Sequence, residues 1–380
     1  MGDRPGNNAG KGIFVASTGQ HIGKTTTSLG IFSGLMKRTR AIGFIKPVGQ
    51  EFVDLGSSIR VDKDVLLFQK RFGLNDQLEH MSPVIFPRGF TRDYVDNRID
   101  LTTIENLITD AYGKLSENSE IVLAEGTGHV GVGSIADIDN ARVAQLLGLP
   151  MILIASGGLG SAFDSLALNK HACDRHGVRI AGVVLNRVRD DKREMIIDYM
   201  TRALSRWDIP LLGAIPYSKT LAALRIDDYA RLFDVPILAG QSHCYRHFDL
   251  IRLVATSNEV YEQLIEPRQL TITPASREDI IDSTLLKLDE WKESGEHLEL
   301  KPGIILTGRY EPDPKIVKRL QDADVPVLYT PLNSFDVMKK ITEHTAKIHI
   351  EDTKKVNTAV DLVESHIDID RLLTVVSSRK

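Results

Sequence analysis

The chain has 380 residues, of which 42% are hydrophobic and 26% are charged, and its formal net charge is -4 at pH 7. This composition is that of an ordinary globular protein and excludes a fibrous or low-complexity chain. The slightly acidic balance argues against a general nucleic-acid-binding protein.

The length, the cysteines and the apolar runs limit the number of domains and the cellular compartment. A chain of 380 residues favours two or three domains over one. Two cysteines, Cys173 and Cys244, provide no disulfide framework, which suits a reducing compartment. No apolar run approaches the length of a membrane span, and residues 1–11 are polar and glycine-rich, unlike a signal sequence. We therefore expect a cytoplasmic protein with a flexible N-terminal tail at residues 1–11 and no membrane attachment.

A phosphate-loop motif follows this tail. The run from Ala16 to Thr26 reads Ala-Ser-Thr-Gly-Gln-His-Ile-Gly-Lys-Thr-Thr, between an apolar run at 12–16 and a helical pattern from Thr25 to about Arg40. A strand–loop–helix order directs the helix N-terminus at bound phosphates. In this motif the glycine allows close backbone approach, the lysine carries a charge to the outer phosphates, and the threonine hydroxyl binds magnesium. The usual pattern has glycine at the position of Thr18, so this loop is a variant. The expected nucleotide contacts here are Thr18, Gly19, Gln20, His21, Ile22, Gly23, Lys24, Thr25 and Thr26.

Short apolar runs alternate with helical patterns through the first half of the chain. Such alternation predicts an α/β fold, in which helices cover both faces of a parallel sheet. The runs are Ile13–Ala16, Ile42–Ile45, Ile121–Ala124, Met151–Ala155, Ile180–Leu185 and Leu211–Ile215, and the clearest helices between them are Leu101–Leu115, Asn140–Leu147 and Ser165–His176.

Polar and glycine-rich residues follow these runs. Lys46 comes directly after the second run, and Glu125 opens the sequence Glu-Gly-Thr-Gly-His-Val-Gly-Val-Gly after the third. Asn186 and Pro216 follow the fifth and sixth runs. Because ligands of open α/β sheets bind at the carboxyl ends of the strands, these residues predict one site at that edge. The glycines of the third sequence predict either a second anion-binding loop or a tight turn.

A second series of elements begins after Pro216 and contains no phosphate loop. We expect a nucleotide-binding domain at 12–216, a smaller αβ domain at 217–350 that includes a linker at 217–236, and a C-terminal helix and tail at 351–380. The expected strands are Leu270–Thr273, Gly303–Thr307 and Val325–Tyr329, and the expected helices are Ile280–Trp291, Ile316–Asp322, Ser334–Thr342 and Thr353–His366.

The motifs together resemble a known family. Glu125-Gly-Thr-Gly-His129, Asn140-Ala-Arg-Val-Ala144 and Phe163-Asp-Ser-Leu-Ala-Leu-Asn169 are similar to dethiobiotin synthetase-like P-loop ATPases. More closely, residues from about 12 to 235 resemble the non-catalytic N-terminal region of long-form phosphate acetyltransferases. Residues from about 220 to 345 resemble the DRTGG domain of that family, through Thr273–Asp279 and Leu306-Thr-Gly308. The 380 residues include no acetyltransferase catalytic domain, so we do not expect acetyl transfer.

The resemblance implies roles for individual residues. Thr25, Asp64 and Glu125 match the positions that hold Mg²⁺ with ATP in dethiobiotin synthetase-like enzymes, and Asp62 is a rival to Asp64. Lys46 matches a second phosphate-facing lysine, so Lys24 and Lys46 are the expected catalytic residues. The resemblance also places Asn186 at the adenine edge and the loop from Pro216 beside the base.

Two functions of different classes remain open. One is a Mg-ATP-dependent phosphoryl-transfer enzyme, an ATPase or ligase that activates a small carboxylate or carbamate. The alternative is a non-catalytic regulatory protein that senses nucleotide and acts on a protein partner. The complete set of Lys24, Thr25, Lys46 and Glu125 favours the enzyme. The resemblance further implies a homodimer, and we expect neither nucleic acid nor a membrane among the partners.

Overall fold

The computed structural model describes residues 12–56, 59–294 and 300–377. They form two compact units. Unit 1 holds the residues up to Ser218 together with those from Ile348 onward, and unit 2 holds Lys219–Lys347. The tail expected at residues 1–11 lies outside the described residues. Within the described ranges, no helix is long and apolar enough to cross a membrane.

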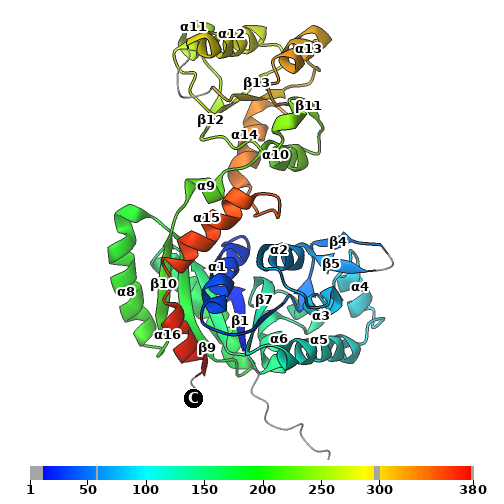
Figure 1. Ribbon diagram of the computed structural model, residues 1–380, viewed down its shortest axis with the longest axis vertical. Coiled ribbons are helices and arrows are strands. Elements are labelled where there is room, and N and C mark those ends of the chain that lie inside the picture. The colour runs from blue at the N-terminus through cyan, green and yellow to red at the C-terminus, as the bar shows by residue number, and fades with distance from the viewer. Residues whose placement is uncertain (1–11, 57–58, 295–299, 378–380) are drawn as a thin grey trace, which may run out of the picture. The chain divides into compact units, whose positions relative to one another are not determined.

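Unit 1 is built on a sheet of six parallel strands in the order β10-β9-β8-β1-β7-β2 (Figure 1). Each apolar run in the first half of the sequence forms one of these strands, which confirms the predicted α/β class. Their residues are mostly buried, as expected for a parallel sheet covered on both faces. The strands are β1 (Gly12–Ser17), β2 (Ile42–Ile45), β7 (Ile121–His129), β8 (Met151–Ser156), β9 (Ile180–Val188) and β10 (Leu211–Pro216).

The strand order distributes the helices over the two faces. From β1 the chain passes to β2 in one direction along the sheet, whereas β2, β7, β8 and β9 each lead to a strand in the opposite direction. Because such crossovers are right-handed, α1 lies on one face and α5 to α8 lie on the other. The order reverses at β1, so the carboxyl end of β1 is the point where α/β sheets bind ligands. These helices are α1 (Lys24–Met36), α5 (Leu101–Glu117), α6 (Asn140–Leu147), α7 (Gly160–Arg175) and α8 (Arg193–Ser205).

A small subassembly between β2 and α5 was not evident in the sequence pattern. Its helix α2 begins after Asp62, whose Oδ1 accepts a hydrogen bond from the Asp64 backbone N–H at 2.9 Å. Phe68 of α2 stacks on Phe44 of β2, with ring centroids 3.7 Å apart, and contacts Phe32 of α1. This packing fixes the first turn of α2 beside the end of β2. The elements are β3 (Val48–Gly49), β4 (Phe52–Asp54), β5 (Arg60–Asp62), α2 (Lys63–Phe72), α3 (Leu78–Met81), β6 (Val84–Ile85) and α4 (Phe90–Val95).

The last described segment returns to unit 1. The sequence predicts one helix and a tail at 351–380, whereas the structure has two helices, α15 (Thr353–Glu364) and α16 (Ile369–Ser377). Between them, Ile367 forms a bridge to Gly213 of the edge strand β10. Helix α16 contacts β9 and β10 (Figure 1). The two helices therefore cover strands of the sheet that α1 does not reach.

Helix α15 and the start of α16 lie directly against α1, and glycines allow this close approach. A Cβ on Gly30 would lie 2.2 Å from Val363 Cβ, and one on Gly34 would lie 2.8 Å from Ile369 Cγ1. Arg38 adds a charged contact, since its Nε donates to Asp370 Oδ1 at 2.6 Å. The helix that leaves the phosphate loop is thus supported by the far end of the chain.

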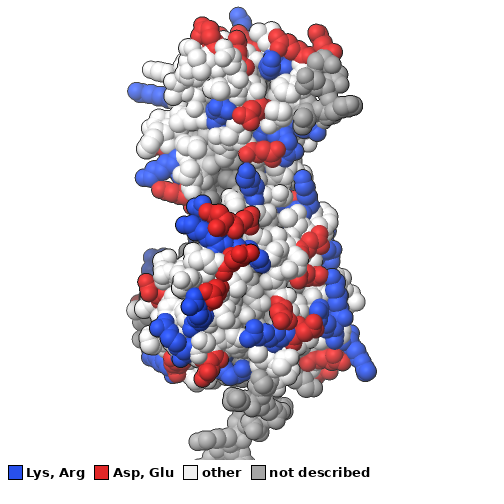
Figure 2. Space-filling view, turned by 90° about the vertical axis from the view of Figure 1, so that its left-hand side faces the viewer, with Lys and Arg blue, Asp and Glu red and all other residues white. Residues whose placement is uncertain are grey.

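The surface of unit 1 carries both signs of charge. Figure 2 shows acidic and basic side chains interspersed on the face that includes α8. Several of them form ion pairs one helical turn apart, such as Asp198 with Arg202 on α8 and Lys170 with Asp174 on α7. Such pairs belong to a solvated helix surface.

Unit 2 is a second αβ layer structure, as predicted. Its sheet has the order β11-β15-β14-β13-β12, in which β12 to β15 are parallel and β11 is antiparallel. The segment expected as a linker at 217–236 contains α10, which buries Ile226 and Tyr229 in the core of this unit. The elements are α9 (Lys219–Ala222), α10 (Ile226–Phe233), β11 (Ile237–Ala239), β12 (Leu250–Leu253), α11 (Asn258–Glu262), β13 (Gln269–Pro274), α12 (Glu278–Ser294), β14 (Gly303–Thr307), α13 (Pro314–Asp322), β15 (Val327–Thr330) and α14 (Ser334–Glu343).

We expect Gly30→Ala to destabilise the protein and Gly113→Ala to stabilise it. The added methyl group at Gly30 overlaps Val363, and overpacking of this kind costs about 1–3 kcal/mol. Gly113 lies inside α5 with nothing within 4 Å of an added Cβ, so the exchange should gain roughly 0.5–1 kcal/mol. The midpoint of thermal unfolding should fall for the first variant and rise for the second. Shifts of the same sign would contradict the close contact between α1 and α15.

Candidate functional site

The phosphate loop connects β1 to α1 at the point where the strand order reverses. Gly23, the residue before α1, has φ 89°, in the left-handed region that favours glycine, and no side chain caps the helix. A Cβ at this position would also lie 2.3 Å from Asn186 Nδ2. Backbone conformation and close packing both require glycine here. The uncapped N–H groups at the start of α1 suit an anion.

A buried cluster of charges lies beside the loop. Lys46 Nζ donates to Asp64 Oδ2 at 2.6 Å and to Glu125 Oε1 at 2.9 Å. Thr25 Oγ1 donates to the same Glu125 oxygen at 3.0 Å. The Lys46 and Glu125 side chains are 5% and 0% exposed. Residues of α1, α2 and β7 therefore meet at one point with Lys46, the residue that follows β2.

The cluster has the chemistry of a magnesium site completed by phosphate. Glu125 Oε2 is buried and accepts no hydrogen bond from the described residues. With the Thr25 hydroxyl and the Asp64 carboxylate, it offers the hard oxygen ligands that Mg²⁺ prefers. In the described part of the chain, no three His, Cys, Asp or Glu side chains are arranged to hold a metal by themselves. The residues present thus fit a magnesium ion that keeps other ligands from nucleotide and water.

The two lysines of the site differ in their electrostatics. Burial and the nearby Lys46 ammonium lower the pKa of Lys24 to about 8, against the opposing effect of Glu125 and Asp64. Burial alone would lower the pKa of Lys46, but Asp64 and Glu125 outweigh it and raise that pKa above its usual value. Lys46 is therefore a permanent cation, whereas Lys24 has a readily lost proton.

The two candidate aspartates also differ. Asp64 contacts Lys46, and although burial alone would raise the pKa of Asp64, Lys46 lowers it below the usual value. Asp62 is 3% exposed and its Oδ1 caps α2. Burial raises the pKa of Asp62 to about 6, despite the nearby Lys46. The geometry brings Asp64, not Asp62, into contact with the lysine of the cluster.

The glycine segment, residues 125–133, forms one wall of the site. Its Gly128 carbonyl accepts hydrogen bonds from Lys24 Nζ at 3.1 Å and from Ser17 Oγ at 3.0 Å. Lys24, the residue expected to face phosphate, is thus held by the protein backbone. A phosphate group would have to replace this carbonyl as the acceptor.

Two buried asparagines, which lie in the sequence motifs but were not predicted to have a role, hold the glycine segment. Asn140 Oδ1 accepts from Thr127 N at 3.1 Å, and its Nδ2 donates to the carbonyl of His129 at 2.7 Å. Asn169 Oδ1 accepts from Val130 N at 3.2 Å, and its Nδ2 donates to Thr18 O of the phosphate loop at 3.1 Å. Asn169 therefore ties the two loops together. The feature of the sequence that could have identified these two asparagines is that each is a polar residue on the buried face of a predicted helix.

Asn186 and Pro216 lie at the ends of adjacent strands. Asn186 Nδ2 donates to Ile22 O at 2.7 Å, and its Oδ1 accepts from Arg187 N at 2.9 Å. Pro216 is the last residue of β10 and pairs with Val188 of β9. The structure brings Asn186 against the phosphate loop, where its amide holds the backbone. Its contact with adenine stays a prediction.

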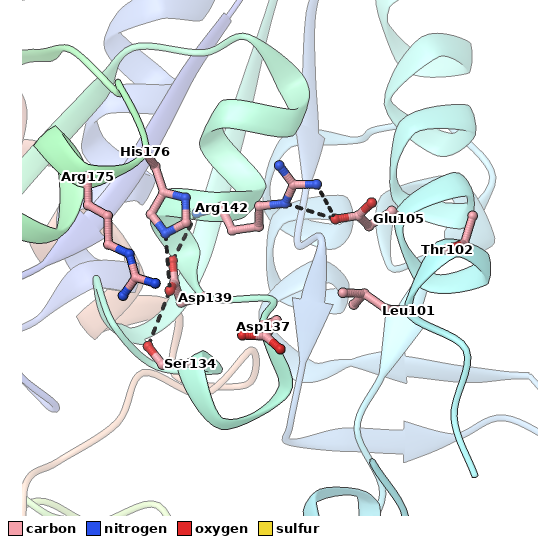
Figure 3. Close-up of a pocket in the computed structure, with 9 residues that line it drawn as sticks. All are labelled: Leu101, Thr102, Glu105, Ser134, Asp137, Asp139, Arg142, Arg175 and His176. Carbon is pink, nitrogen blue, oxygen red and sulfur yellow. Dashed lines mark hydrogen bonds and ion pairs between the residues drawn. The ribbon is translucent and has the colours of Figure 1, made fainter. Parts of the chain in front are cut away.

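A separate polar cavity of about 410 Å³ lies between α5, α6 and the end of α7 (Figure 3). Arg142 Nε donates to Glu105 Oε1 at 2.9 Å, and His176 Nε2 lies 3.6 Å from Asp139 Oδ2. None of the residues predicted for the nucleotide site lines this cavity. Its charged side chains largely pair with one another.

Comparison with known proteins supports the resemblance seen in the motifs. Residues 11–225 match the AAA domain family, and residues 228–344 match the DRTGG domain. The chain is 24% identical over 377 residues to phosphate acetyltransferase of Nitratidesulfovibrio vulgaris, a match that covers 97% of this chain and 52% of that protein. It is 26% identical over 379 residues to phosphate acetyltransferase of Pseudomonas aeruginosa, covering 95% and 51%. It is also 26% identical over 226 residues to the ATP-dependent dethiobiotin synthetase of Nitrosospira multiformis, covering 60% of this chain and 96% of that enzyme. The chain spans about half the length of the phosphate acetyltransferases it matches.

We expect only one of the two lysines to be needed for stability when each is replaced by methionine. Lys46→Met leaves the carboxylates of Asp64 and Glu125 without their cation, which should cost about 3–5 kcal/mol in the free energy of unfolding at pH 7. Lys24→Met removes a cation that burial already disfavours, so the free energy of unfolding should stay the same or rise.

Urea unfolding of both variants checks this prediction. The deficit of Lys46→Met should shrink as the pH falls towards 5, because Lys46 lowers the pKa of Asp64 in the wild type and this carboxyl takes up a proton more readily without that cation. Equal losses for both lysines would show that Lys46 does not neutralise the carboxylates.

Proposed function

The chain belongs to the AAA domain family through residues 11–225, and from this premise we propose that unit 1 is a Mg-ATP-dependent phosphoryl-transfer enzyme that activates a small carboxylate or carbamate. The observation that carries the proposal is the meeting of Lys24, Thr25, Lys46 and Glu125 at the carboxyl edge of the sheet. A binding site alone would not need a second lysine held by Glu125, which is buried, and by Asp64, which is 27% exposed.

The magnesium ion is assigned to Thr25, Glu125 and Asp64. The free Glu125 Oε2 supports this assignment, and the Lys46–Asp64 contact favours Asp64 over Asp62. When bound, magnesium supplies positive charge to the phosphate oxygens.

The lysines neutralise the charge that moves with the phosphoryl group. Phosphoryl transfer asks a protein mainly for positioning and for positive charge. Lys46 is held by two carboxylates, so its ammonium group is already oriented before nucleotide binds. Lys24 exchanges the Gly128 carbonyl for the outer phosphates. The uncapped start of α1 contributes further N–H donors.

Part of the molecule favours the second candidate, a nucleotide-sensing regulatory protein. Dethiobiotin synthetases carry other residues at Gly49, Gln50, Phe163 and Asp164, where their own substrate is held. Here Phe163 stacks on Trp207, with ring centroids 4.4 Å apart, and so is engaged by the protein itself. The match to half of each phosphate acetyltransferase is also consistent with a regulatory role.

Phosphate release from Mg-ATP separates the two functions. We expect turnover that depends on bicarbonate or a pool of small amines and carboxylates, and a loss of roughly 100-fold or more in Lys24→Ala, because the outer phosphates lose their cation. Lys63→Ala is the matched control, since Lys63 is exposed at the start of α2. Tight Mg-ATP binding without turnover under any of these conditions would exclude the enzyme and leave the sensor.

Nucleotide binding should take up protons near pH 8. Lys24 has a pKa of about 8 in the absence of nucleotide, and adjacent phosphates favour its charged form, which raises this pKa. About half a proton should be bound per nucleotide at pH 8, and affinity should fall as the pH rises further. Calorimetry in two buffers with different ionisation enthalpies measures the uptake. Uptake that persists in Lys24→Met would assign it to another group.

A further inference from the structure

In unit 2, the segments that follow two neighbouring parallel strands lead to opposite faces of the sheet. Helices α11, α12 and α13 pack on one face, through Tyr261, Ile280 and Ile316, and α10 and α14 pack on the other, through Tyr229 and Val337 (Figure 1). The chain therefore leaves β14 towards one face and leaves the adjacent strand β15 towards the other. Ligands of open α/β sheets bind at the carboxyl ends of strands where neighbouring connections diverge in this way.

Three contacts join the two loops at this point, and a fourth lies within the loop that follows β15. The Gly308 backbone N–H donates to Leu332 O at 2.8 Å, and Tyr329 Oη donates to Gly308 O at 2.9 Å. The hydroxyls of Thr307 and Ser334 share a hydrogen bond of 2.6 Å, and Leu332 N donates to Thr330 Oγ1 at 3.4 Å. The loops that follow β14 and β15 thus form one connected surface. Thr307 and Gly308 belong to the motif that resembles the DRTGG domain, to which the function proposed for unit 1 assigns nothing.

Two large aromatic side chains on this surface are unusually exposed to solvent. Tyr310 is 79% exposed and Phe335 is 71% exposed, more than most large hydrophobic side chains in the described ranges. Arg309, also exposed, makes no ion pair or side-chain hydrogen bond with any described residue. Gly308 has φ 109°, and nothing lies within 4 Å of a Cβ built on it, so the space beside its Cα is open to an approaching group, while its N–H and C=O are bonded within the protein. Two aromatic rings and an unpaired guanidinium thus border this open space.

We propose that unit 2 binds a nucleoside monophosphate at the loops that follow β14 and β15, with the base against Tyr310 and Phe335 and the phosphate at Arg309. Aromatic rings offer a stacking surface to a base, and the planar guanidinium forms paired hydrogen bonds with phosphate. Glu311 and Asp336 follow the two aromatic residues in the sequence. Their carboxylates repel the additional negative charge of a longer phosphate chain. The site therefore takes a monophosphate in preference to a triphosphate.

Binding of AMP to the full chain carrying Lys24→Ala tests the proposal, because this substitution weakens the phosphate loop of unit 1. Calorimetry should detect one AMP per chain. Tyr310→Ala and Phe335→Ala should each weaken AMP binding about ten-fold, as expected for loss of a stacked ring. Arg309→Ala should weaken AMP binding and leave adenosine binding unchanged, because adenosine has no phosphate.

Tyr199→Ala, which removes a tyrosine 50% exposed on α8 of unit 1, is the matched control and should leave AMP binding unchanged. Because Tyr310 and Phe335 are largely exposed, their variants should fold, which circular dichroism checks. AMP binding that is unchanged in the double variant of Tyr310 and Phe335, or absent from the folded Lys24→Ala chain, would overturn the proposal. Full competition by inorganic phosphate without any adenosine binding would overturn the role of the aromatic rings.

Discussion

The ammonium group of Lys46 between Asp64 and Glu125 is the interaction on which the rest of the site depends. The carboxylates of Glu125, which is fully buried, and Asp64, which is partly buried, repel each other, and the cation of Lys46 in contact with both stabilises the arrangement. Lys46 follows β2, Asp64 lies in the first turn of α2 and Glu125 lies on β7. One cation therefore joins three separate segments, and it also orients the carboxylate that contacts Thr25 of the phosphate-loop helix.

The phosphate loop is supported from two directions. On one side, Asn169 and Asn140 hold the glycine segment, whose Gly128 carbonyl accepts from Lys24. On the other side, α15 packs against Gly30 of α1 and the start of α16 packs against Gly34, so the helix behind the loop has little room to move. Both supports act on backbone and leave the functional side chains of the loop free to change partners. This combination suits a site that must exchange a protein acceptor for a phosphate.

The two units use the same sheet geometry with different chemistry. In unit 1 the strand order reverses at β1, and the residues there are glycine, lysine and threonine, which suit a phosphate chain and a metal. In unit 2 the connections diverge after β14 and β15, and the exposed residues there are Tyr310, Phe335 and Arg309. Topology selects where a ligand can bind in each sheet, and the local residues select its chemical class.

The sequence by itself determined the α/β class, the six strands of unit 1 and the phosphate loop, because continuous apolar runs and a strand–loop–helix motif are local signals. It also named Lys46, Asp64 and Glu125 as candidates, through resemblance to a family, but it left Asp62 and Asp64 open. Only the tertiary structure showed that the Asp64 carboxylate contacts Lys46, whereas the Asp62 carboxylate caps α2. The two residues have the same sequence context, but their side chains point in different directions. The sequence also did not predict the roles of Asn140 and Asn169, the packing of α15 against α1 or the hydrogen bonds that join the two loops of unit 2. Each is a contact between distant segments, which no local pattern of residues records.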